Sequence, residues 1–175
     1  MTAPAQSVLP GFPAPPMAPE NNQHWGTPPE FLRAVARRFG PIGLDLAAKE
    51  DNHVAPAYFG PGSPFEHEDT LSPLCVWDEW IDRRELRWPN PPFGAIPPFA
   101  EKCACYRGVT TIAMLTHAAT DTEWFDDHVF GKALVLLLKG RIQFVGADQG
   151  FPKPLMLSVF SPYVAPGVDL WRWRS

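Results

Sequence analysis

Proline constrains the fold of this chain more than any other feature, because it occupies 22 of the 175 positions. A soluble protein of average composition has about 5% proline, which would be roughly nine residues in a chain of this length. The proline ring fixes φ and removes the backbone N–H, so proline inside a helix kinks or ends it. The sequence therefore disfavours helical bundles and coiled coils, and it predicts short helices and strands.

The rest of the composition predicts one globular domain. Apolar residues make up 45% of the chain, with 12 Phe and 7 Trp, which is enough for a hydrophobic core. Residues 1–22 contain six prolines and no periodicity, so we expect a disordered proline-rich tail followed by a single domain over residues 23–175. No apolar run reaches the roughly 18 residues of a membrane span, and the N-terminus does not resemble a secretion signal. We therefore expect a soluble, unexported protein.

The cysteines predict no disulfide framework and no metal site. Only Cys75, Cys103 and Cys105 are present, which is an odd number without framework spacing. The pair at 103 and 105 lacks a second pair that would complete a zinc site. We expect all three to be reduced, buried thiols.

The charge is unevenly distributed along the chain. The formal net charge is −4, which alone argues against binding to nucleic acid. However, residues 41–131 carry 6 basic and 15 acidic groups, whereas residues 132–175 carry 6 basic and 2 acidic groups. The C-terminal quarter could therefore hold a polyanion, although ordinary surface variation explains the counts equally well.

A helix is predicted directly after the tail. Thr27 has the position of an N-cap, Pro28 that of the first helical residue, and Glu30 completes a capping box. Apolar residues then recur at helical spacing as far as Phe39, and a glycine and a proline at 40–41 end the helix.

The remaining pattern alternates between strands and helices. Further helices are predicted over residues 97–108 and 121–130, and strands over residues 42–46, 86–88, 109–115, 133–138, 140–144 and 155–160. Because strands and helices alternate first and strands cluster at the end, we expect an α/β sheet closed by an antiparallel hairpin.

Residues 88–93, with the sequence Trp-Pro-Asn-Pro-Pro-Phe, carry the chemistry that is easiest to interpret. Two prolines after Asn90 fix the backbone and leave rigid carbonyl acceptors. The side-chain oxygen of Asn90 and the carbonyl of Pro91 could accept both N–H bonds of an aromatic amine, while Phe93 stacks on its ring. Accepting these hydrogens would direct the nitrogen lone pair at an electrophilic methyl group. Taken alone, the motif could equally be a simple turn with Phe93 in the core.

The motif follows other landmarks in a specific order. Trp25-x-Thr27-Pro28, then Leu44-Asp45-Leu46-Ala47-Ala48, then Glu68-Asp69-Thr70-Leu71 precede it. In this order the sequence resembles the phage-type DNA N6-adenine methyltransferase (Dam-like) family, and the resemblance covers roughly residues 24–162. It implies a class I S-adenosylmethionine-dependent methyltransferase-like (Rossmann-like) α/β sheet with a C-terminal antiparallel hairpin. It also implies methyl transfer from S-adenosylmethionine to adenine N6 in double-stranded DNA, without a metal, in the cytoplasm of a bacterial host or phage-infected cell.

The resemblance implies a set of site residues. It places catalysis at Asn90, Pro91, Pro92 and Phe93, and cofactor contacts at Trp25, Thr27, Pro28, Asp45, Ala47 and Asp69. In the family, the position of Thr27 helps hold the methionine carboxylate, that of Asp45 faces the cationic end of methionine, and that of Asp69 accepts from the adenine amine. A capping role for Thr27, a turn role for Asp45 and a solvated loop position for Asp69 are the alternatives. Glu50 and Asp51 are candidates for the ribose contact.

Two departures from the family pattern stand in this sequence. Ala47 and Ala48 occupy the place of the Gly-x-Gly of the broader superfamily, and Phe93 stands where tyrosine is more frequent. The change at position 93 keeps the stacking ring and loses a hydroxyl, so we expect activity to survive it.

DNA contacts are assigned from charge. Lys139, Arg141 and Lys153 lie in the basic quarter and are the expected phosphate contacts. Residues 171–174, Trp-Arg-Trp-Arg, could add stacking and charge, or could form an edge strand with exposed arginines. Methylation of RNA or of a protein amide, and a non-catalytic DNA-binding module, remain alternatives, and the oligomeric state stays open.

Overall fold

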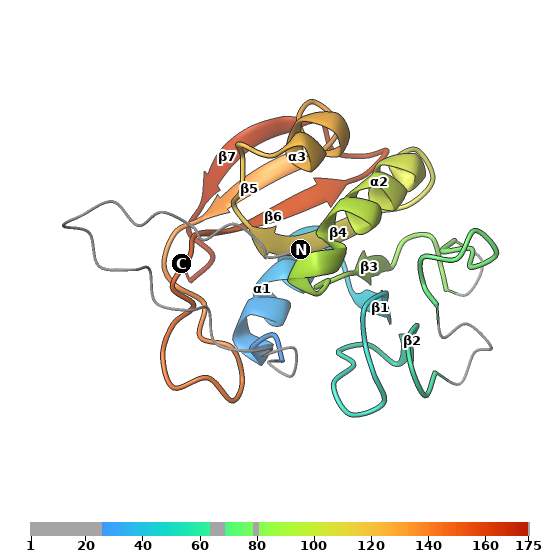
Figure 1. Ribbon diagram of the computed structural model, residues 1–175, viewed down its shortest axis with the longest axis horizontal. Helices are drawn as coiled ribbons and strands as arrows, with labels where there is room; N and C mark the ends of the chain where they lie inside the picture. Colours follow the sequence, from blue (N-terminus) through green and yellow to red (C-terminus); the bar gives the residue numbers. More distant parts are fainter. Residues whose placement is uncertain (1–25, 64–68, 79–80, 175) are drawn as a thin grey trace, which may run out of the picture.

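The computed structural model describes residues 26–63, 69–78 and 81–174 (Figure 1). The proposed tail and Trp25 lie outside these residues, as does Glu68. Seven strands form one sheet: β1 (Ile42–Asp45), β2 (Ala57–Tyr58), β3 (Leu86–Trp88), β4 (Ile112–His117), β5 (Leu134–Leu138), β6 (Leu155–Phe160) and β7 (Gly167–Trp171). The helices are α1 (Pro29–Phe39), α2 (Ile96–Tyr106), α3 (Glu123–His128) and a 3₁₀ turn η1 (Phe93–Ala95).

The strands lie in the order β2-β1-β3-β4-β6-β5-β7. β2, β1, β3 and β4 pair in parallel, β6 runs antiparallel to both of its neighbours, and β7 is parallel to β5. Since β1, β3 and β4 are parallel neighbours, their carboxyl ends meet at one edge of the sheet. In open α/β sheets this edge is where ligands bind.

Helices cover both faces of the sheet. On one face, α2 and α3 contribute Phe99, Cys103 and Phe125 to a core with Ile112 and Met114 of β4. On the other face, α1 packs Phe31 and Val35 in a cluster with Ala113 and Leu115. These two residues of β4 alternate along the strand with the two that face α2 and α3. β4 is therefore the central strand, with both faces buried, as its continuous apolar run predicted.

Most predicted elements are present, with shifted ends. β4 begins at Ile112 rather than at residue 109, and α2 and α3 are shorter than predicted. The predicted strands at 86–88 and 155–160 are confirmed residue for residue. The antiparallel pair formed by β5 and β6 confirms the expected reversal, and β7 adds a parallel edge strand beyond it.

The predicted strand over residues 140–144 is wrong. Ile142 and Phe144 are buried and alternate with exposed neighbours, so the two-residue period is real. However, the segment lies in the loop between β5 and β6 and packs on the α1 side of the sheet, while β7 takes the place beside β5. Its backbone bonds go elsewhere: Phe151 N–H donates to the Ile142 carbonyl and Val145 N–H to the Gly26 carbonyl.

The predicted helix start is also wrong by one residue. Pro28 is the N-cap and Pro29 the first helical residue, and no side chain caps the helix. The Pro28 carbonyl accepts from the N–H groups of Phe31 and Leu32, and the Thr27 hydroxyl is used elsewhere.

Two further findings concern the cysteines and helix length. Cys75 and Cys103 are buried free thiols as expected, whereas Cys105 is exposed on α2, which corrects the expectation of three buried thiols.

α1 and α2 have 11 residues each. Within the described chain, no helix combines the length and apolar character of a membrane span.

Candidate active site

The Asn90 loop is held between the ends of three strands. Leu46 N–H, just after β1, donates to the carbonyl of Trp88, the last residue of β3, at 2.8 Å. Leu115 N–H of β4 donates to the Pro89 carbonyl at 3.0 Å. Pro92 then accepts from Ala95 N–H and starts η1, which continues into α2. The loop is therefore fixed from both sides at the carboxyl edge of the sheet.

Asn90 contacts Thr27 at the start of α1. The Asn90 Nδ2 group lies 3.4 Å from the Thr27 hydroxyl oxygen, and Thr27 is buried. Among the described residues, nothing donates to Asn90 Oδ1 or to the Pro91 carbonyl oxygen. The contact with Thr27 thus orients the amide so that its oxygen and the neighbouring carbonyl are both available as acceptors.

Asp45 lies beside this loop, at the end of β1 opposite Trp88 in the strand register. Its side chain is 4% exposed, and its two oxygens accept from Ala47 N–H and Val54 N–H, each at 3.1 Å. Burial raises the pKa of Asp45 to about 6, although the two hydrogen bonds and the nearby His53 oppose the shift. The turn role is therefore present, and the buried carboxyl group is one that a neighbouring cation would ionise.

A glycine from another segment packs against the backbone of Ala48, where the broader superfamily has Gly-x-Gly. Gly60 has a positive φ of +141°, and a Cβ at this position would lie 1.9 Å from the Ala48 carbonyl oxygen. Ala48 N–H donates to the Phe59 carbonyl at 3.2 Å. The close backbone approach next to Ala47 is thus provided by Gly60 after β2, which the sequence pattern did not reveal.

Phe93 lies on the surface, and its ring contacts two other rings. Its side chain is 61% exposed, which excludes the core position that was the alternative. Its ring centroid lies 5.3 Å from that of His117, at the end of β4, and 5.7 Å from that of Phe151, in the loop before β6. Burial, and secondarily the charge of Lys153, lowers the pKa of His117, and its Nδ1 is buried without a partner among the described residues. The three rings form a cluster next to the Asn90 loop, called here the aromatic surface after its exposed member Phe93; His117 is half-buried and Phe151 is buried.

The other predicted cofactor residues are less closely connected. Asp69 is exposed and accepts from Leu71 N–H at 3.0 Å, and Lys102 of α2 anchors its segment by donating to the carbonyls of Thr70, Ser72 and Cys75. No described contact joins Asp69 to Asp45 or Asn90. Pro28 is buried and Ala47 is half-buried, and Glu50 and Asp51 are exposed.

Two of the three predicted DNA contacts, Arg141 and Lys153, lie beside the aromatic surface. Lys139 follows β5, Lys153 precedes β6, and both are exposed, as is Arg141. The Arg141 guanidinium donates to the Phe151 carbonyl at 3.3 Å, so it also holds the loop that carries this ring. β7 is an edge strand that ends at Trp171, so the edge-strand alternative for residues 171–174 is confirmed for Trp171 alone; the two arginines lie beyond the strand and are exposed, and Trp173 is buried.

Comparison with known proteins identifies the family. The profile of the DNA N-6-adenine-methyltransferase (Dam) family matches residues 17–168. The chain belongs to this family. The resemblance read from the motifs is thereby confirmed.

A curated Dam relative comes from Escherichia phage T1, where it is named a DNA N-6-adenine-methyltransferase. It is 24% identical to this Dam family member over 142 residues, which cover 72% of this chain and 55% of the relative. The chain thus spans about half the length of the curated relative that it matches.

Sequence reasoning missed two members of the aromatic surface of this Dam family protein. His117 and Phe151 come from the end of β4 and from a loop, and only the fold brings them to Phe93. One signal for His117 is present in the sequence. It stands two residues after the apolar run at 109–115, and a histidine at the carboxyl end of a buried strand has the position of a site residue.

Proposed function

We propose that this chain transfers a methyl group from S-adenosylmethionine to the N6 amine of adenine in double-stranded DNA. The observation that carries the proposal is the Asn90 loop, in which the contact with Thr27 leaves two acceptors free beside the buried Asp45. The family and the phage relative support the same activity. The sheet order, with β6 reversed between β4 and β5, supports a class I, Rossmann-like arrangement.

The catalytic role is assigned to residues 90–93. Asn90 Oδ1 and the Pro91 carbonyl would accept the two N–H bonds of the adenine amine, which turns the nitrogen lone pair out of conjugation with the ring. Pro91 and Pro92 hold these acceptors without adjustment, because their φ angles are fixed. Phe93 would stack on the base, since an exposed ring at this edge can receive an adenine taken out of the duplex.

The cofactor residues are assigned from charge and position. S-adenosylmethionine would supply a methyl group on a cationic sulfur and leave as a neutral thioether, and the methylated amine would lose one N–H proton to water. Asp45 would ionise next to its cationic methionine end, and Thr27 would orient Asn90 while facing the same region. Trp25, Pro28, Ala47 and Asp69 are proposed as further contacts on the strength of the family pattern.

The DNA is placed across the aromatic surface. Arg141 and Lys153 would contact phosphates near the extruded base, because Arg141 bonds to the Phe151 backbone and the charge of Lys153 acts on His117. Lys139, an exposed cation after β5, would contact a phosphate further along the same strand ends. The substrate DNA and the enzyme would meet in the cytoplasm of a bacterial host or a phage-infected cell.

Transfer of tritium from labelled S-adenosylmethionine tests the proposal. Wild-type protein should label duplex DNA, and Asn90→Ala should lower the rate by at least about a hundredfold, as does loss of other positioned transition-state acceptors and donors. Pro98→Ala changes an exposed proline in the first turn of α2 and should leave the rate unchanged.

The other outcomes would replace the proposal. Label that enters RNA or protein instead of DNA would change the substrate. Absence of both label and calorimetric cofactor binding would indicate a non-catalytic module with this fold.

A further inference from the structure

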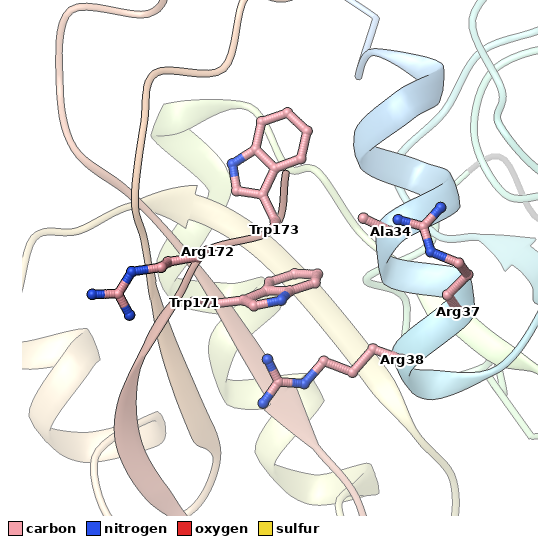
Figure 2. Close-up of a pocket in the computed structure, with 6 residues that line it drawn as sticks. All are labelled: Ala34, Arg37, Arg38, Trp171, Arg172 and Trp173. Carbon is pink, nitrogen blue, oxygen red and sulfur yellow. The ribbon is translucent and has the colours of Figure 1, made fainter. Parts of the chain in front are cut away.

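A second feature of the surface lies between α1 and the end of β7 (Figure 2). It is a cavity of about 180 Å³, called here the α1/β7 cleft, and it is lined by Ala34, Arg37, Arg38, Trp171, Arg172 and Trp173. Figure 2 shows the arginines of α1 on one side and the C-terminal segment with its two indoles on the other. None of these residues takes part in the proposed chemistry.

Aromatic packing holds the cleft in shape. The ring of Phe31, which is fully buried in α1, lies 5.8 Å from Trp171 and 5.0 Å from Trp173. The Arg38 guanidinium lies 5.1 Å from the centre of the Trp171 ring. That of Arg174 lies 4.2 Å from Trp173. An arginine held over an indole keeps its N–H groups available at the edge of the stack, where a planar array of donors suits phosphate oxygens.

The cleft has an excess of positive charge. Arg37 and Arg38 are exposed and form no ion pair with a carboxylate in the described part of the chain. No acidic residue lines the cleft among the described residues; Asp169, two residues before Trp171, accepts from Leu170 N–H at 2.7 Å. Trp173 Nε1 is buried and has no acceptor among the described residues. Arg37 and Arg38, which are exposed and have no carboxylate partner among the described residues, favour an anionic ligand at the mouth of the cleft.

We propose that the α1/β7 cleft binds the phosphate backbone of the DNA at a distance from the methylated base. This inference rests on the proposed function and adds a second contact region to it. The cleft is connected to the first region, because Arg174 donates to the Arg141 carbonyl at 3.1 Å and Lys139 N–H donates to the Trp171 carbonyl at 3.0 Å. A basic surface thus continues from the loop after β5 into the cleft.

The length of α1 sets the spacing of the two regions. Thr27, just before α1, contacts Asn90, and Arg38 lies at the other end of the helix. At a rise of 1.5 Å per residue, the nine steps from Pro29 to Arg38 span roughly 14 Å. With 3.4 Å between successive base pairs, that length corresponds to about four base pairs. The cleft therefore lies about one length of α1 from the Asn90 contact, and it adds contacts to the DNA backbone without reading the sequence.

Fluorescence anisotropy with a labelled 24-base-pair duplex tests the inference. The double variant Arg37→Gln/Arg38→Gln should bind at least about tenfold more weakly, and its slope of log affinity against log salt should be smaller by about 2, one for each lost phosphate contact. The double variant Arg107→Gln/Lys132→Gln removes the same charge from the end of α2 and from the turn before β5, and it should keep the wild-type slope. Thermal unfolding and calorimetric cofactor binding should be unchanged in both variants.

The kinetics of methyl transfer separate this inference from the proposed function. Because the cleft is distant from the reacting atoms, loss of its arginines should raise the KM for DNA and leave kcat unchanged. Wild-type protein that methylates DNA, together with an Arg37→Gln/Arg38→Gln variant whose salt slope equals that of the control, would overturn the inference alone. Wild-type protein that binds no DNA would overturn the proposed function as well.

Discussion

Acidification should weaken the binding of S-adenosylmethionine, because Asp45 must be ionised to meet its cationic end. Burial raises the pKa of Asp45 to about 6. At pH 5, about one molecule in eleven would carry the ionised carboxylate, so affinity should be about tenfold lower than at pH 7.5, equivalent to about 1.4 kcal/mol. Isothermal titration calorimetry in buffers of different ionisation enthalpy should also show proton release on binding below pH 6.

The same carboxyl group should affect the stability of the free protein in the opposite direction. Its pKa is higher in the folded chain, about 6, than the ordinary value of 3.8. Its contribution to the free energy of unfolding is therefore fully present below pH 3.8 and is lost as the pH rises through 6. The difference is about 2 pKa units, which is worth on the order of 3 kcal/mol. Urea titrations at pH 4.5 and 7 should show about 2 kcal/mol of this decrease, because pH 4.5 already lies above the unfolded pKa.

The variant Asp45→Asn provides the control for both measurements. It should bind the cofactor weakly and with the same affinity at pH 5 and pH 7.5. Its unfolding should also lose the dependence on pH between 4 and 6, although one of the N–H groups of Ala47 and Val54 would lose its acceptor, at a cost of about 1–3 kcal/mol. Equal wild-type affinities at pH 5 and pH 7.5, without proton release, would refute the role of Asp45.

Three other predictions follow from the site and the core. Thr27→Val removes the hydroxyl that orients the Asn90 amide and should lower kcat about three- to tenfold, whereas Thr27→Ser should keep it; equal initial rates for valine and wild type would contradict the contact. Phe93→Ala should lower kcat/KM for DNA at least about tenfold through lost stacking, and Phe93→Tyr should retain the wild-type value; an active alanine variant would remove the ring from the site. In native protein an aromatic disulfide reagent should modify Cys105 only, because burial raises the pKa of Cys103 and Cys75; three rapidly reacting thiols would show that the fold is wrong around α2.

The central strands could be predicted because their signals are local. The apolar runs that became β5 and β6 are buried on the sheet, and β4 is buried on both faces, so burial and β-branched residues agree there. The loop around Asn90 could be predicted because two prolines leave its backbone few conformations. Its position beside Asp45 follows from the parallel pairing of β1 and β3.

The features that could not be predicted depend on contacts between distant segments. Residues 140–144 have the period of a strand, but β7 pairs with β5 and leaves that segment to pack over the sheet face. Thr27 has the sequence position of a helix cap, but its hydroxyl oxygen accepts a hydrogen bond from the amide of Asn90, 63 residues later. Arg38 ends an amphipathic helix in the sequence, and its stacking on Trp171 appears only when the C-terminal segment folds back onto α1.

Mass spectrometry of nucleosides tests the central claim most directly. Duplex DNA incubated with S-adenosylmethionine and the protein should yield N6-methyl-2′-deoxyadenosine after digestion, and Asn90→Ala should abolish it while Pro98→Ala does not. A methyl group found on cytosine or on a ring nitrogen of adenine, or undiminished product from Asn90→Ala, would contradict the account.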